Sequence, residues 1–172
     1  AHSACAGQAA DLDALLAGRL VSGETIDERR RTLVAKLGEK ISVRRFVRQD
    51  SGGPQGAYLH GTRIGVLVAL EGGDAALAHD LAMHIAASNP RFLSVADVPA
   101  AEVAKEREIL VEQAQQGGKS PEIVAKMVAG RLRKALGEIS LLGQPFVKDP
   151  ERTVEQLLAA AGASVREFQR FE

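Results

Sequence analysis

YLHGTRIGVLVALEGG, residues Tyr58–Gly73, contains the longest apolar, β-branched run of the chain at Ile64–Leu70. This run is too short to cross a membrane and is rich in Val and Ile, which favours a buried strand. Tyr58–Thr62 predicts a shorter strand that leads into a turn, and Glu71–Gly73 ends the run before a helix. We therefore expect a strand pair at the centre of the fold, with the other elements packed on it.

Composition restricts the class of protein. The 172 residues suit one domain or two small subdomains. The 22 basic and 22 acidic residues balance, which argues against nucleic acid as the main partner. The lone Cys5 excludes an internal disulfide; a reducing, cytoplasmic compartment fits, and a secreted protein without disulfides would look the same. Ala1–Ala10 has no signal-peptide pattern, and the start without Met indicates a fragment or a processed product.

Helical periodicity and capping signals predict helices on both sides of the strand pair. Asp11–Leu20 carries leucines on one face. The capping box Thr25–Glu28 opens a second helix that ends at its C-cap Gly38, with Ile26, Leu33, Val34 and Leu37 facing inward. Asp74 caps a third helix, Ala75–Ser88. A short helix follows a second capping box that begins at Thr153.

Two long helical patterns, Pro99–Gln116 and Pro121–Leu136, are separated only by a short loop with Gly117 and Gly118. Helices joined by so short a loop lie antiparallel. Their outer faces are rich in charged residues and Gln, which favours a hairpin that protrudes from the rest of the fold.

Three further segments are predicted strands: Ile41–Arg48, Ile139–Val147 and Ser164–Phe171. The order of elements does not alternate as βαβ. The sequence therefore predicts an α+β fold, with small antiparallel sheets packed with helices and a protruding antiparallel helical hairpin.

The sequence contains no arrangement typical of an active site. His79 and His84 are five residues apart on a helix, which turns them to different faces and argues against a zinc pair. We expect a surface His79 and a semi-buried His84. His60 is either a hydrogen-bonded turn histidine or a contact with a partner. Phosphate-binding glycine motifs are also absent. We therefore predict that the protein is not an enzyme and holds no metal or cofactor, and that it functions by binding another protein.

Five sequence blocks, in order, resemble bacterial translation elongation factor Ts, as does the ending Arg170–Glu172. The resemblance runs from about Arg29 to the end and is weaker over Ala1–Glu28. The blocks are Val34–Glu39, Tyr58–Gly61 with Arg63–Val68, Ala82–Ser88, Lys126–Arg131 and Gly143–Val147.

The resemblance implies a guanine-nucleotide exchange factor for elongation factor Tu. Such a factor binds the GTPase, loosens GDP and its magnesium, and leaves when GTP rebinds. It implies no direct contact with nucleotide, nucleic acid or membrane. Four residues match family positions that contact the partner: Leu37 and Gly38 toward the GTPase domain, His60 in the same set, and Val147 in the C-terminal subdomain.

The resemblance also implies a domain organisation. Residues 1–50 match part of the N-terminal core subdomain and residues 51–172 the C-terminal core subdomain, with the hairpin, a coiled coil in the family, inserted at residues 99–137. The family's N-terminal helical module and its Thr-Asp-Phe-Val motif are absent from this sequence. We therefore expect the chain to bind elongation factor Tu yet to exchange nucleotide poorly.

Two alternatives remain open. One is a non-catalytic module that docks elongation factor Tu or another partner without exchange activity. The other is a small-molecule enzyme, which requires a pocket that gathers His60 or His84 with a carboxylate of strongly shifted pKa.

Overall fold

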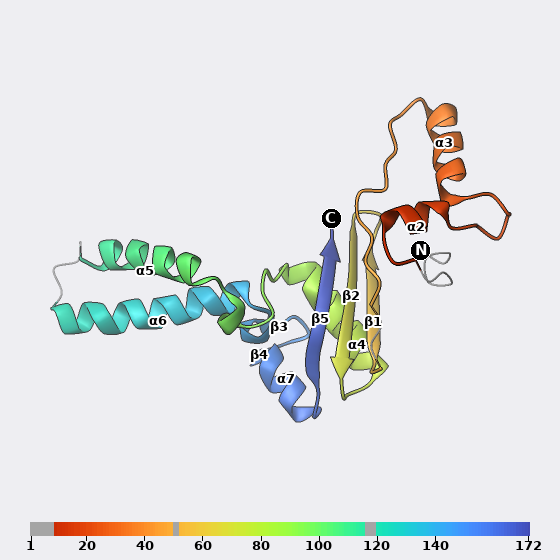
Figure 1. Ribbon diagram of the computed structural model, residues 1–172. Helices are drawn as coiled ribbons and strands as arrows, with labels where there is room; N and C mark the ends of the chain where they lie inside the picture. The colour runs from red at the N-terminus through yellow and green to blue at the C-terminus, as the bar shows by residue number, and fades with distance from the viewer. Residues whose placement is uncertain (1–8, 50–51, 116–119) are drawn as a thin grey trace. The chain divides into compact units, whose positions relative to one another are not determined.

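The computed structural model describes residues 9–49, 52–115 and 120–172. The chain divides into two compact units, residues 1–50 and 51–172. The described parts contain helices and two small antiparallel sheets, so the predicted α+β class is confirmed (Figure 1).

A three-stranded antiparallel sheet forms the centre of the second unit, in the order β1-β2-β5. Its strands are β1 (Gln55–His60), β2 (Ile64–Glu71) and β5 (Ser164–Phe171). The middle strand, β2, contributes the buried residues Val66, Val68, Ala69 and Leu70, as the apolar run predicts. The predicted strand pair and the predicted last strand are therefore confirmed.

Helix α4 (Ala75–Ser88) packs against β1 and β2. Asp74 caps it, accepting a hydrogen bond from the backbone N–H of Leu77 at 2.8 Å. Leu81 and Ile85 are fully buried in the main hydrophobic core. A glycine at position 56 allows β1 to approach this helix, because a Cβ there would overlap the backbone carbonyl of Ala78.

The chain after α6 folds differently from the prediction. Ile139 completes α6, a 3-10 helix spans Leu141–Gly143, and only Pro145–Phe146 forms strand β3. The predicted strand over Ile139–Val147 is therefore wrong. The backbone N–H groups of Ser140, Gly143 and Gln144 bond to carbonyls three residues back, which curls the segment instead of extending it. Strand β4 (Asp149–Thr153) pairs with β3, and helix α7 (Val154–Ala160) adds Val154 and Leu158 to the core.

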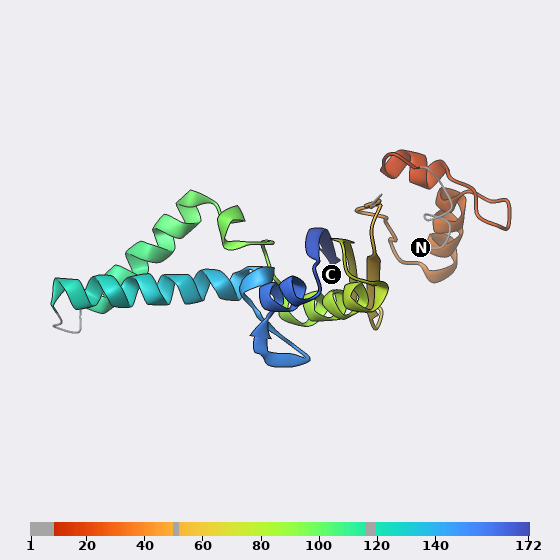
Figure 2. The ribbon, with the colours of Figure 1, turned by 90° about the horizontal axis from the view of Figure 1, so that it is seen from below.

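Helices α5 (Ala100–Gln115) and α6 (Pro121–Ile139) pack through their own small cluster, which contains Leu110, Ala114 and Val128. Figure 2 shows that the two helices diverge away from this cluster. Coiled-coil packing along the whole pair is therefore not confirmed. The predicted glycine turn at Gly117 and Gly118 lies outside the described residues.

The first unit contains α2 (Leu12–Ala17) and α3 (Ile26–Leu37). Helix α2 ends earlier than predicted, because Gly18 adopts an extended backbone and Arg19 forms an isolated bridge with Thr25. No residue of α3 is buried, and Leu37 is 58% exposed, so its predicted inward orientation is wrong.

The predicted strand Ile41–Arg48 is also wrong, since the chain is irregular from Ile41 to Gln49. Half-buried and exposed residues alternate at its start, as in a strand. No described strand pairs with this segment, however, and a strand requires a neighbour to satisfy its backbone N–H and C=O groups.

Candidate functional site

The four residues that the sequence singled out all lie at the surface, each where a regular element ends. Leu37 and Gly38 close α3 in the first unit. His60 is the last residue of β1, and Val147 lies between β3 and β4, both in the second unit. Leu37 is 58% and Val147 42% exposed, and both are among the large apolar side chains that the fold leaves uncovered.

Gly38 ends α3 in the left-handed region, at φ +71°, where its N–H donates to the carbonyl of Val34 at 2.9 Å. A residue with a Cβ is strained there, whereas glycine is not. This cap stops the helix directly after Leu37 and leaves the leucine side chain exposed at its end.

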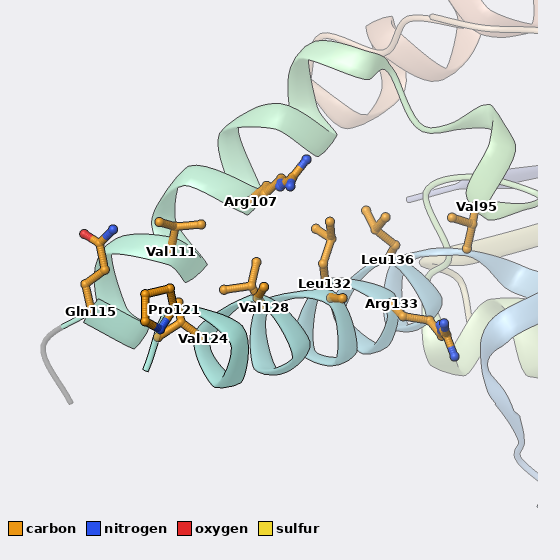
Figure 3. A pocket seen from close by; sticks show the side chains of 12 residues that line it. Val95, Arg107, Val111, Gln115, Pro121, Val124, Val128, Leu132, Arg133 and Leu136 are labelled. Atoms are coloured by element: carbon orange, nitrogen blue, oxygen red, sulfur yellow. The ribbon is translucent and has the colours of Figure 1, made fainter. Parts of the chain in front are cut away.

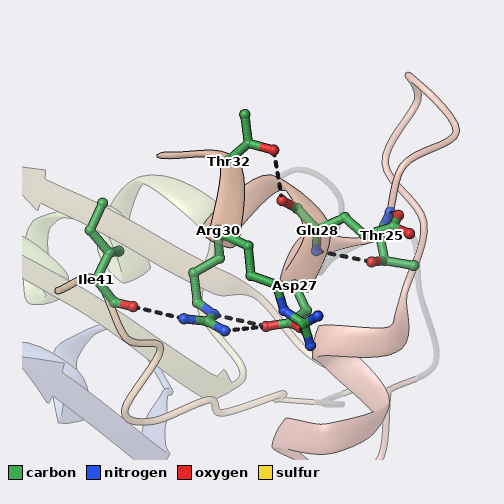
Figure 4. Close-up of polar contacts among 7 residues, drawn as sticks. Thr25, Asp27, Glu28, Arg30, Thr32 and Ile41 are labelled. Atoms are coloured by element: carbon green, nitrogen blue, oxygen red, sulfur yellow. Dashed lines mark hydrogen bonds and ion pairs between the residues drawn. The ribbon is translucent and has the colours of Figure 1, made fainter. Parts of the chain in front are cut away.

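Polar contacts hold α3 in the absence of buried residues (Figure 4). Thr25 and Glu28 cap each other's backbone N–H groups, at 2.7 and 3.1 Å. Arg30 donates to Asp27 and to the carbonyl of Ile41, which ties the following segment back to the helix. The hydrogen bond from Arg30 lowers the pKa of Asp27, and the hydrogen bond from the Thr25 backbone lowers the pKa of Glu28.

His60 belongs to an aromatic group where β1 meets α4. The Tyr58 hydroxyl lies 3.2 Å from Nδ1 of His60, within hydrogen-bond distance. The Tyr58 ring also meets His79 edge-on, with 5.9 Å between ring centroids. His79 donates from Nδ1 to the carbonyl of Ala57 at 3.2 Å. The exposed His60 is thus held by Tyr58, and its neighbour Leu59 is 74% exposed.

The backbone of Val147 contacts His84 of α4, and the His84 side chain is completely buried. The Val147 backbone N–H donates to Nδ1 of His84 at 3.3 Å. Because Nδ1 accepts, the ring proton is on Nε2, which donates to Oε1 of Gln144 at 3.0 Å. The Gln144 amide in turn donates to the carbonyl of Glu138 at 2.7 Å.

Burial lowers the pKa of His84, and the hydrogen bond with Gln144 offsets part of this effect. The ring is therefore neutral at pH 7. This state is the one that the contact requires, because a protonated imidazole has no acceptor for the Val147 N–H.

An ion pair supplies a second attachment of the same loop to α4. Lys148 Nζ lies 2.6 Å from Oδ1 of Asp80, which precedes His84 by about one helical turn. Asp80 and His84 thus hold adjacent residues of the β3–β4 loop from one side of α4.

An apolar groove of about 760 Å³ lies between α5 and α6 (Figure 3). Its apolar side chains come from both helices and from the turn before α5. Arg107 of α5 and Arg133 of α6 are the charged residues that line it. The apolar lining consists of Val95, Val111, Pro121, Val124, Ala125, Val128, Ala129, Leu132 and Leu136.

No metal site or membrane span is found in the part of the chain that the structure describes. No cluster of three or more His, Cys, Asp or Glu there is arranged to hold a metal ion. None of the described helices is both long and apolar enough to cross a membrane. The side-chain partners found for His60 and His84 are Tyr58 and Gln144, neither of which is a carboxylate.

Comparison with known proteins decides the family. The family model described as Elongation factor TS matches residues 1–172. The chain belongs to the elongation factor Ts family.

Curated relatives share about half of its residues. Elongation factor Ts of Methylococcus capsulatus is 56% identical over 170 residues, which are 98% of this chain and 58% of the relative. The protein of that name from Hydrogenovibrio crunogenus is 52% identical over 162 residues, 94% of this chain and 55% of the relative. Elongation factor Ts of Xanthomonas campestris pv. campestris is 51% identical over 172 residues, which are 99% of this chain and 59% of the relative. The chain thus spans less than two thirds of these elongation factor Ts proteins.

The resemblance seen in the sequence is confirmed as membership of the elongation factor Ts family, whereas the contact roles of its four residues stay predictions. Sequence reasoning placed His84 as semi-buried and missed its contacts. The available signal was a histidine three residues after Leu81 on an otherwise apolar face. Its partner Gln144 is 60 positions away, which the sequence pattern does not reveal.

Proposed function

We propose that the chain acts as a guanine-nucleotide exchange factor for elongation factor Tu in translation elongation, promoting GDP release by binding the GTPase. Identities of 51–56% to proteins named Elongation factor Ts, over nearly the whole chain, carry this proposal. The partner is a protein, and the chain itself contacts neither nucleotide nor nucleic acid nor membrane. The setting is the cytoplasm.

The proposed activity needs no acid, base or cofactor. A protein that binds the nucleotide-free GTPase more tightly than the GDP-bound form must weaken GDP binding by the same factor, because the two equilibria are linked. The chain therefore needs a surface that fits one shape of its partner.

Exposed apolar side chains support the assigned contacts. Leu37 and Val147 leave 58% and 42% of their surface in contact with water. Burying this apolar surface against a partner is favourable, at roughly 25 cal/mol per Å² before the costs of association. In this proposal Leu37, Gly38 and His60 contact the GTPase domain, and Val147 makes a separate contact from the C-terminal subdomain.

The test is the release of a fluorescent GDP analogue from purified elongation factor Tu, with and without this chain. We expect release to be faster than the spontaneous rate, but only weakly so because the sequence lacks the Thr-Asp-Phe-Val motif, and slower again with Val147→Asp. The matched control is Val21→Asp, because Val21 is an exposed valine with no assigned contact. Release at the spontaneous rate with the unmodified chain would contradict the proposal.

A second candidate is a docking module that binds a protein without exchanging nucleotide. The groove between α5 and α6 favours it, because Arg107 and Arg133 accompany an apolar lining. Such a surface fits an amphipathic helix with acidic residues beside its apolar face. Calorimetric binding of elongation factor Tu without faster GDP release would support this candidate over exchange. Loss of that binding in the double variant Arg107→Glu, Arg133→Glu would assign it to the groove.

A further inference from the structure

We propose that His84 is a positioning residue, whose neutral ring sets the conformation of the segment Gln144–Lys148, which contains β3 and the β3–β4 loop, and thereby controls how Val147 meets the partner. The inference rests on the proposed function for the partner contact alone. The positioning of the loop is independent of it.

The backbone of Val147 is hydrogen-bonded to the core, whereas its side chain is exposed. Its N–H donates to the fully buried His84, while its side chain is 42% exposed. The preceding Phe146 points the other way, is 5% exposed, and lies with its ring centroid 5.7 Å from that of His84. Contact with His84 therefore fixes which of the two apolar side chains faces outward.

The sheet alone gives this loop little support. Strand β3 is two residues long, and its pairing with β4 is irregular between Pro145 and Phe146. A regular hairpin sets its side-chain orientation through a continuous ladder, and a shift of one residue reverses it. Here the side-chain contacts from α4 take over that role.

The contacts form a chain with a single consistent direction of hydrogen bonding. The Val147 N–H donates to Nδ1 of His84, and Nε2 of His84 donates to Oε1 of Gln144. The Gln144 amide donates to the carbonyl of Glu138 at the end of α6, so its orientation is fixed at both ends. Every donor has an acceptor only while His84 is neutral.

Protonation of His84 breaks this chain at one point. Nδ1 then carries a proton that faces the Val147 N–H, so two donors oppose each other. Three carboxylates on the surrounding elements form ion pairs of their own. Asp80 of α4 pairs with Lys148, Asp149 of β4 with Arg152, and Glu138 of α6 with Lys134.

Two amide variants separate the two ring contacts. In His84→Asn the side-chain oxygen takes the place of Nδ1 and still accepts from Val147. In His84→Gln the amide takes the place of Nε2, and the acceptor for Val147 is lost. We expect the affinity for elongation factor Tu, measured by calorimetry, to fall about tenfold in His84→Gln and less than about threefold in His84→Asn.

The unmodified chain provides a test that requires no variant to fold. In a ¹⁵N NMR titration, the Val147 amide signal should move together with the His84 ring signals, with a midpoint below pH 6.5. A Val147 amide that ignores the His84 titration would overturn the proposal, as would equal losses of affinity in the two variants. Coupled titration without any binding of elongation factor Tu would support the positioning of the loop and overturn only the proposed function.

Discussion

The backbone N–H of Val147 donates a hydrogen bond to Nδ1 of His84 across 3.3 Å, although 63 positions separate the two residues. The contact joins an exposed candidate partner contact to the buried centre of α4. Together with the ion pair between Asp80 and Lys148, it makes the surface of the β3–β4 loop depend on a core helix. Changes at a buried residue can thus alter binding at the surface.

The first prediction concerns stability against pH. Burial lowers the pKa of His84 below its value of 6.5 in an unfolded chain. Between these two pKa values the unfolded state binds more protons at this residue, so stability falls as the pH decreases below 6.5. Urea unfolding between pH 8 and pH 5 should show this loss. His84→Phe keeps a ring but does not titrate, and should flatten the profile. An unchanged profile in that variant would assign the pH dependence to other groups.

The second prediction compares two glycines. A Cβ at position 56 would overlap the Ala78 carbonyl, so Gly56→Ala should destabilise the second unit by about 2 kcal/mol. Gly130, inside α6, has open space where a Cβ would lie. Gly130→Ala should therefore stabilise by roughly 0.5–1 kcal/mol through helix propensity. Chemical denaturation of both variants measures the change in the free energy of unfolding, which should be negative for Gly56→Ala and positive for Gly130→Ala. Equal changes in the two variants would show that β1 does not approach α4 this closely.

The third prediction concerns the capping box of α3. Thr25 accepts from the Glu28 N–H, so Thr25→Ala should weaken the helix by about 1 kcal/mol. Thr32 donates to the carbonyl of Glu28 within the same helix and caps nothing. Thr32→Ala is the matched control and should be neutral or slightly stabilising. Hydrogen exchange of the amides at the start of α3 reports the difference, and equal protection in both variants would refute the role of the cap.

Local sequence signals predicted the elements that depend on local physics. The apolar run Ile64–Leu70 predicted the central strand, and the capping boxes at Thr25 and Thr153 predicted two helix starts. These signals suffice because a buried strand needs a continuous apolar run, and a helix start needs acceptors for its free N–H groups.

The failures occurred where structure depends on residues far away in the sequence. Ile41–Arg48 alternates like a strand but has no described strand beside it. Ile139–Val147 is apolar enough for a strand. Backbone hydrogen bonds to carbonyls three residues earlier curl it instead. The contact of His84 with Val147 depends on how α4 packs against the β3–β4 loop. The family resemblance implied a role for Val147, but no signal in the sequence pointed to the residue that holds it.

The fourth prediction tests the partner surface without disturbing the fold. Leu37 is 58% exposed, so Leu37→Asp should leave the free energy of unfolding within about 0.5 kcal/mol of the original. The same change should weaken binding of elongation factor Tu at least about tenfold, because it places a charge in the proposed apolar contact. Calorimetry measures the affinity, with Val21→Asp as the exposed control. Equal affinities in the two variants would remove Leu37 from the contact surface.

The central claim is that this chain distinguishes the nucleotide-free form of elongation factor Tu from the GDP-bound form. The direct measurement is a pair of calorimetric titrations of the chain into each form, under identical magnesium and salt. The account predicts tighter binding to the nucleotide-free form. Because the two equilibria are linked, the ratio of the two affinities equals the factor by which the chain weakens the binding of GDP to elongation factor Tu. Equal affinities would contradict the proposed exchange activity, and absence of binding to both forms would contradict the proposal that elongation factor Tu is the partner.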